Sequence, residues 1–298
     1  MIQANHLVKR FTKIKSVDDL SFSVKKGEIF GLLGPNAAGK TTTIRILCGI
    51  MKADSGEVRI NNNSIEASKK DFGYVAQYFG QYEELSVWEN LKFYAEMYGV
   101  DDEARLLHLL ERYQLSAFKE RKAGELSGGY KRRLALVCAL AHDPKVLFLD
   151  EPTAGIDPVT RKLLWDDFYA LSAEGKTLFV TTHYMEEASR CHQLAFIAEG
   201  KMIAQGTPQS IKKALGDVDV FTLNTAYDPL LIKAINTIAG VVLTNQFGEN
   251  LHIVINRGVE KEQLIAAIER VKQHKVVLEE TEPDLEDVFI ALTQGARS

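Results

Sequence analysis

Apolar residues recur along this chain in two patterns, as short uninterrupted runs and with the spacing of a helix. The uninterrupted runs at 29–33, 146–149 and 177–181 are typical of strands that are buried on both faces of a sheet. Helical spacing follows the first two runs, at 40–50 and 158–173. Because strands and helices alternate, the pattern predicts an α/β fold with a mostly parallel sheet between layers of helices.

Two regions around this α/β pattern have a different periodicity. Apolar and polar residues alternate at 17–24 and 56–60, which predicts an antiparallel β subdomain. Apolar residues spaced by three and four over 86–118, and a further helical segment over 127–141, predict a helical subdomain. We place that subdomain at about residues 78–135.

The pattern changes after residue 216, where a smaller set of elements begins. Strand-like and helix-like segments follow one another in the order β-α-β-β-α-β, a common plan of small domains. The predicted segments are 218–223, 229–239, 241–245, 251–255, 260–273 and 276–280. The sequence therefore predicts two domains, residues 1–216 and a small α+β, ferredoxin-like domain over residues 217–298.

Composition and charge narrow the class of protein. An apolar content of 46% and a charged content of 26% over 298 residues are ordinary for a globular chain. A net charge of -4 argues against a dedicated nucleic-acid binder, and no nucleic-acid partner is expected. No apolar run is long enough for a membrane span and the N-terminus lacks signal-peptide features, so we expect a soluble, cytoplasmic chain.

The three cysteines, Cys48, Cys138 and Cys191, lie far apart in the sequence and form no CxxC pair. All three have apolar or helical surroundings. We therefore expect buried, reduced thiols, as in a cytosolic protein.

A glycine-rich loop lies between the first buried strand and the helix after it. Its residues are Gly34, Pro35, Asn36, Ala37, Ala38, Gly39, Lys40 and Thr41, which fit the pattern GxxxxGK[ST]. In this context the backbone N–H groups curl around phosphates at the positive end of a helix. Lys40 would reach the β- and γ-phosphates of ATP and Thr41 would bind Mg²⁺, with Thr42 as a further ATP contact.

Two adjacent acids, Asp150 and Glu151, follow the apolar run at 146–149. A buried strand that ends in acids delivers them to the edge of the sheet where α/β proteins bind ligands. Asp150 suits the ligand shell of Mg²⁺, and Glu151 suits a base that orients the attacking water. Taken alone, the pair is better explained as a strand end that becomes polar where it reaches solvent.

His183 and Gln77 each follow a predicted strand of the same sheet. His183 could hydrogen-bond to the γ-phosphate and the attacking water. Gln77 could bind Mg²⁺ and water through its amide. Neither residue type is diagnostic on its own, so both assignments depend on the neighbouring motifs.

A second turn with exposed N–H groups precedes the helix predicted at 127–141. Ser127 is a favourable N-cap, and Gly128 and Gly129 follow it. The simple interpretation is a helix cap. The functional interpretation is a second anion-binding helix end, which would serve the nucleotide of a partner subunit, since the first loop already holds its own.

In this order, the motifs resemble those of the nucleotide-binding subunits of ATP-binding-cassette (ABC) transporters. The resemblance covers about two-thirds of the chain. It adds a D-loop ending at Asp157 and an aromatic, Phe11, at the position where the family stacks adenine; a core aromatic is an equal alternative for Phe11. It implies a P-loop NTPase cassette with an antiparallel β subdomain and a helical subdomain.

The resemblance also implies partners. Two subunits would form a head-to-tail homodimer, in which residues 127–129 of one close on the ATP held by Lys40 of the other. Residues 78–113 would contact integral membrane permease subunits at the cytoplasmic face of the membrane. The segment 282–289 resembles the ending of drug-efflux subunits of the daunorubicin-pump type, which implies an exporter.

Two residues depart from the family pattern. Ala37 stands where glycine is usual, which is cheap only if the backbone there is right-handed. Tyr130 replaces the usual glutamine of the signature. Neither change removes a catalytic group.

Three other functions are compatible with parts of the sequence. The chain could be an ATP-dependent assembly or regulatory module without a transport role. A small-molecule kinase would have no use for the signature and the D-loop. A cassette that binds ATP without turnover is disfavoured, because Lys40, Asp150, Glu151 and His183 are all present.

Overall fold

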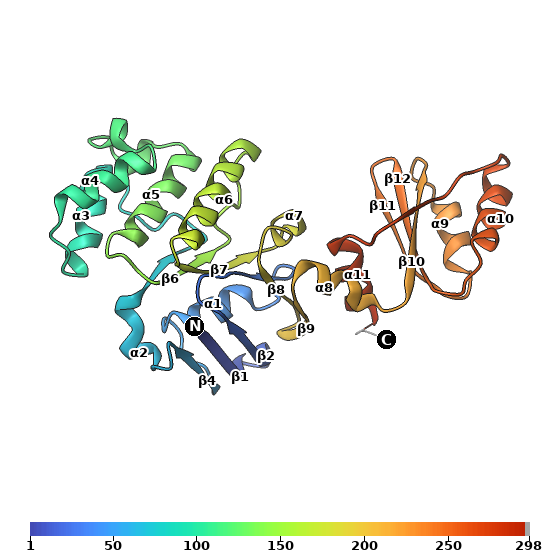
Figure 1. Ribbon diagram of the computed structural model, residues 1–298, viewed down its shortest axis with the longest axis horizontal. Helices are drawn as coiled ribbons and strands as arrows, with labels where there is room; N and C mark the ends of the chain where they lie inside the picture. The colour runs from blue at the N-terminus through green and yellow to red at the C-terminus, as the bar shows by residue number, and fades with distance from the viewer. Residues whose placement is uncertain (296–298) are drawn as a thin grey trace. The chain divides into compact units, whose positions relative to one another are not determined.

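The computed structural model describes residues 1–295 and divides into two compact units, Met1–Gln205 and Gly206–Ser298 (Figure 1). The division comes earlier than the boundary predicted at 216/217. The reason is that α8 (Pro208–Lys212) and the turn that follows it pack against α11 (Leu285–Gly295) of the second unit. No helix among residues 1–295 is long and apolar enough to cross a membrane.

A six-stranded sheet forms the centre of the first unit. Its strands are, in spatial order, β5 (Phe72–Val75), β6 (Val146–Asp150), β7 (Thr177–Thr182), β3 (Ile29–Leu33), β8 (Gln193–Ala198) and β9 (Lys201–Gly206). The first five pair in parallel, and every residue of β3, β6 and β7 is buried. The predicted parallel sheet is therefore confirmed. Its apolar runs have no polar face because helices or a second sheet cover both sides.

The second sheet of this unit is antiparallel, with the order β2 (Ile14–Val24), β1 (Ile2–Phe11), β4 (Ser55–Ile60). Apolar side chains fill the space between the two sheets. The rings of Phe22, Phe30 and Phe179 stack there with centroids 5.4 to 5.6 Å apart. Such aromatic contacts add to the burial energy that holds two sheets together.

Seven α-helices belong to the described part of the first unit. They are α1 (Lys40–Leu47), α2 (Ile65–Ser68), α3 (Val87–Met97), α4 (Glu103–Arg112), α5 (Gly128–Leu140), α6 (Pro158–Ala173) and α7 (Met185–Ala188). In Figure 1, α3, α4 and α5 lie together, away from β1, β2 and β4. The helical pattern predicted over 86–118 corresponds to two helices and a 3₁₀ turn, and Gly99, with φ 71°, follows the end of the first helix.

The second unit has a four-stranded antiparallel sheet in the order β11-β12-β10-β13. Its elements are β10 (Val218–Asn224), α9 (Pro229–Asn236), β11 (Val241–Phe247), β12 (Asn250–Asn256), α10 (Lys261–Lys272) and β13 (Glu279–Thr281). The predicted β-α-β-β-α-β order is correct. The last strand is shorter and later than predicted, since only residues Glu279 to Thr281 pair with β10.

Helix α11 starts with a reciprocal cap. Asp284 accepts a hydrogen bond from the Asp287 backbone (2.7 Å), and Asp287 accepts one from the Asp284 backbone (3.2 Å). The Asp287 carboxylate also lies 3.0 Å from Nδ1 of His252 on β12. One nitrogen or carboxylate oxygen from each of these three side chains lies within 4.8 Å of the other two, a spacing that would also suit a metal ion. The hydrogen bonds of the cap account for this spacing.

The three free cysteines Cys48, Cys138 and Cys191 are buried, as predicted. Burial raises the pKa of each thiol, because the thiolate is poorly solvated there. We predict that a disulfide reagent modifies them slowly in the native chain and rapidly in concentrated guanidinium. Thiol release followed by absorbance measures both rates, and fast modification of the native chain would contradict the packing.

Candidate functional site: a phosphate loop with a buried carboxylate

The glycine-rich loop connects β3 to α1, and its first and last glycines lie against neighbouring backbone. A Cβ at Gly34 would come within 2.3 Å of the Ile197 carbonyl oxygen, and one at Gly39 within 2.2 Å of the Ser16 carbonyl oxygen. Gly39 also has φ 105°, a left-handed value that side chains disfavour. Only glycine fits at these two positions. The two glycines therefore allow the loop to pack closely against the neighbouring backbone just before α1.

Ala37 is left-handed, with φ 65°. Alanine in place of glycine would cost little free energy only with a right-handed backbone, and the backbone here is not right-handed. A left-handed alanine costs about 1–2 kcal/mol because its Cβ crowds the carbonyl oxygen. The loop tolerates this strain while Gly34 and Gly39 fix its two ends.

Lys40 opens α1, and its side chain is 4% exposed. Its ammonium donates hydrogen bonds to the carbonyl oxygens of Gly34 (2.8 Å) and Pro35 (3.1 Å). It also lies 3.2 Å from Oε1 of Glu151. The cation is thus held inside the curl of the loop, where a phosphate would meet it.

Thr41, in the first turn of α1, and Asp150, at the end of β6, bring oxygen atoms together. The Thr41 hydroxyl donates to Oδ1 of Asp150 at 3.3 Å, and Thr181 of β7 donates to the same atom at 2.6 Å. Burial raises the pKa of Asp150, and these two hydrogen bonds oppose the rise. A hydroxyl beside a carboxylate is a set of hard oxygen donors that fits Mg²⁺.

Glu151 is the meeting point of the predicted catalytic residues. Its Oε2 accepts a hydrogen bond from the amide of Gln77 (3.2 Å) and lies 3.1 Å from Nδ1 of His183. Its Oε1 faces Lys40. The structure therefore brings together side chains from α1 and from the segments that directly follow β5, β6 and β7.

The backbone of Glu151 is left-handed, with φ 46°. Its N–H donates to the carbonyl oxygen of Thr181 at 3.1 Å and lies 3.0 Å from that residue's hydroxyl. These contacts hold an unfavourable conformation that turns the carboxylate toward Lys40.

Arg132 is a residue that the sequence analysis did not single out. It lies on α5, and its guanidinium donates to the carbonyl oxygens of Ala76 and Gln77. Burial lowers its pKa. Arg132 is the middle of three consecutive basic residues, and the sequence alone does not distinguish it from Lys131 and Arg133.

Ser127 is the N-cap of α5, and Gly128 and Gly129 form its first turn. Ser127 and Gly128 are exposed. Among residues 1–295, no hydrogen bond or ion pair connects these three to Lys40 or Glu151. Tyr130 packs beside Phe118, with ring centroids 4.4 Å apart.

Three other predicted residues lie outside the group around Glu151. Asp157 is the N-cap of α6 and accepts from the backbone of Val159 (3.0 Å) and Thr160 (2.9 Å). The Thr42 hydroxyl lies 2.9 Å from that of Ser16. Phe11 ends β1 and is 44% exposed. The roles predicted for these three remain predictions.

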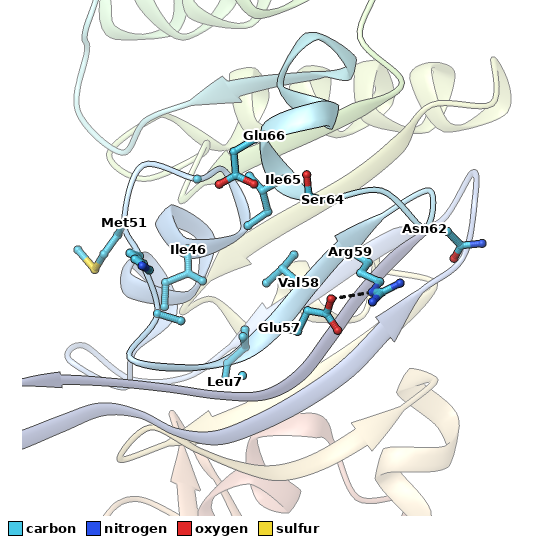
Figure 2. Close-up of a pocket in the computed structure, with 14 residues that line it drawn as sticks. Leu7, Ile46, Met51, Glu57, Val58, Arg59, Asn62, Ser64, Ile65 and Glu66 are labelled. Atoms are coloured by element: carbon cyan, nitrogen blue, oxygen red, sulfur yellow. Dashed lines mark hydrogen bonds and ion pairs between the residues drawn. The ribbon is translucent and has the colours of Figure 1, made fainter.

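A cavity of about 620 Å³ lies elsewhere on the first unit (Figure 2). Its walls come from β4, the segments on either side of it and the end of α1, with Ile46, Val58 and Ile65 as apolar lining. The ion pair of Arg59 with Glu57, at 2.8 Å, lies at its edge. None of the predicted site residues lines this cavity, so the functional argument rests on the phosphate loop.

The fold and the site together define a class. A strand, a glycine loop with a buried lysine and a helix form a phosphate-binding P-loop, and two acids, the last residue of β6 and the residue after it, lie beside it. The parallel sheet places these groups at the carboxyl ends of its strands, where α/β proteins bind nucleotides. The molecule is a P-loop nucleotide-binding protein.

Comparison with known proteins identifies the family. Residues 17–154 match the family model described as ABC transporter. The chain is 38% identical over 302 residues to "Nod factor export ATP-binding protein I" of Paraburkholderia xenovorans, covering 98% of this chain and 96% of the relative. It is 40% identical over 219 residues to "Probable multidrug ABC transporter ATP-binding protein YbhF" of Escherichia coli, covering 71% of this chain but only 38% of the relative.

A solved structure is similar as well. The dimeric ATP-binding cassette MJ0796, described in a post-hydrolysis state bound to ADP and Pi, matches with a TM-score of 0.65 at 25% identity. The match covers 70% of this chain and 98% of that one. The chain belongs to the ABC transporter family, as one of its ATP-binding cassettes.

The strain at Ala37 gives a prediction. Ala37→Gly should raise the free energy of unfolding by up to about 1 kcal/mol, since glycine accepts a left-handed φ but also gains freedom in the unfolded chain. The control is Ala38→Gly, whose backbone is not left-handed and which should destabilise by about 0.5–1 kcal/mol. Calorimetry of the full chain without nucleotide measures both; a lower melting temperature for Ala37→Gly would contradict the strain.

Proposed function

We propose that this chain binds ATP with Mg²⁺, hydrolyses it as a dimer and powers export through a membrane partner. The observation that carries the hydrolytic part is the position of Glu151, whose carboxylate faces Lys40, Gln77 and His183 at 3.1 to 3.2 Å. This set joins a phosphate-binding cation to groups that orient water.

Phosphate recognition falls to the loop and to Lys40. The loop's backbone N–H groups and the start of α1 attract the phosphate oxygens, and Lys40 supplies a point charge. Thr41 and Asp150 would hold Mg²⁺, with the side-chain amide oxygen of Gln77 as a further ligand. The bound ion would neutralise charge on the β- and γ-phosphates. Since a hydroxyl and a carboxylate are hard oxygen donors, they fit this ion.

Water activation falls to Glu151 and His183. The Glu151 carboxylate accepts a hydrogen bond from the attacking water and takes its proton as the γ-phosphorus–oxygen bond forms, and ADP leaves as the bond to the γ-phosphate breaks. His183 lies 3.1 Å from the same carboxylate and orients the water and the γ-phosphate. Gln77 donates to the same carboxylate oxygen and restrains the Glu151 side chain.

The signature turn supports a dimer. Ser127 and Gly128 are exposed at the N-terminus of α5, where N–H groups lack helix partners. We propose that they bind the ATP held by a second copy, in a head-to-tail homodimer with two sites at one interface. The dimeric cassette among the similar structures supports the formation of a dimer.

Exposed apolar side chains support a permease contact. Tyr78, just after Gln77, is 80% exposed, and Tyr82 and Met97 are 51% and 67% exposed. We propose that this part of residues 78–113 binds an integral membrane subunit at the cytoplasmic face. Export is proposed because relatives are named for multidrug transport and Nod factor export. The C-terminal resemblance to drug-efflux subunits points the same way.

The test is Glu151→Gln in the full-length chain. The variant should lose at least about 100-fold in the rate of ATP hydrolysis, because the amide cannot accept the proton of water. It should also remain dimeric with ATP and Mg²⁺, as light scattering would show. Phosphate release measures turnover.

The control is Glu186→Gln, which alters a side chain that is 89% exposed and should leave turnover unchanged. If Glu151→Gln hydrolyses ATP as fast as the unmodified chain, the assignment of Glu151 is wrong. If neither protein dimerises with ATP, the homodimer is wrong.

A further inference from the structure

Glu187 is a buried acid that the ATP site described above does not use. It lies on α7, and its side chain is 1% exposed. Its Oε1 accepts a hydrogen bond from the hydroxyl of Thr153, and its Oε2 accepts one from the hydroxyl of Thr182 at 2.7 Å. One carboxylate therefore binds two hydroxyls, both of them also buried.

The two threonines belong to different catalytic segments. Thr153 lies in the segment that starts at Glu151 and leads to the N-cap of α6 at Asp157. Thr182 is the last residue of β7 and directly precedes His183. Glu187 therefore connects the segment that carries the base to the segment that carries the histidine.

Further contacts fix this bridge. The Nε of Arg161, on α6, lies 3.8 Å from Oε1 of Glu187, and its guanidinium lies 4.6 Å from the ring centre of Tyr184. The Thr182 hydroxyl, in turn, accepts a hydrogen bond from the Tyr184 backbone at 3.0 Å. The negative charge of Glu187 thus has one nearby cation and two hydroxyl donors, which is how a buried carboxylate becomes tolerable.

We infer that Glu187 is a positioning residue for ATP hydrolysis, which holds Glu151 and His183 at the separation that orients water between them and the γ-phosphate. The inference rests on the roles proposed above for Glu151 and His183. The separation of these two side chains is 3.1 Å, and a misplacement of about 1 Å costs on the order of 100-fold in rate. Glu187 belongs neither to the glycine-rich loop nor to the contacts of Lys40, which are the groups proposed to bind the phosphates. The affinity for ATP should therefore not depend on it.

The first experiment compares Glu187→Gln with the control Glu186→Gln in the full-length chain. Glutamine keeps the size of the side chain but loses the charge that faces Arg161 and one of the two carboxylate acceptors. We expect kcat to fall about 10- to 100-fold, with KM and the equilibrium Kd for ATP within about 3-fold. The Glu186 variant should match the unmodified chain.

A double-mutant cycle separates positioning from simple stability. Thr153→Val and Thr182→Val should each lower kcat, and neither should lower it further in the Glu187→Gln background, because all three changes break the same bridge. A purely structural role would instead lower the melting temperature and leave kcat per folded molecule unchanged. Independent, additive effects on kcat would overturn the inference.

A second measurement needs no turnover. In Glu187→Gln, backbone amides of residues 151–157 and 182–187 should exchange with deuterium faster, while those of α1 stay protected. Unchanged exchange in both segments would overturn the inference. Glu151→Gln is assayed in parallel. If Glu151→Gln stays active, the proposed catalytic site is wrong. If only Glu187→Gln stays active, the positioning role of Glu187 is wrong and the proposed site is unaffected.

Discussion

The parallel pairing of β3, β6 and β7 is the constraint on which the site depends. Because the three strands run in the same direction, their carboxyl ends lie at one edge of the sheet. Lys40 begins the helix beyond the first, Glu151 follows the second and His183 follows the third. Lys40 and Glu151, more than a hundred positions apart in the sequence, thus come within 3.2 Å of one another, and the buried apolar strands supply the energy that keeps them there.

The sequence was informative where the physical signal is local. Uninterrupted apolar runs predicted the buried strands, and the spacing of Gly34, Gly39 and Lys40 predicted the loop, because each depends on neighbouring residues. It was less informative about ends of elements: α3 stops where Gly99 allows a left-handed turn, and the second unit starts earlier because α8 packs on α11. These outcomes depend on contacts between distant segments.

The residues missed at the site share one property. Thr181, Arg132 and Glu187 act through partners on other elements, and their residue types are common in any sequence. Ala37 is a different case, because its residue type was noticed but its left-handed backbone follows from how the two ends of the loop are fixed. Long-range geometry decides such details after the fold has formed.

The contact of Arg132 with the segment before α3 has a consequence for communication between two copies. The N-terminus of α5 carries the turn proposed to meet a partner's nucleotide, while Arg132, farther along the same helix, holds the backbone of Ala76 and Gln77. A helix transmits a shift along its axis with little loss. If the proposed dimer forms, a partner's nucleotide that displaces the start of α5 would also displace Gln77, which would couple the two nucleotide sites.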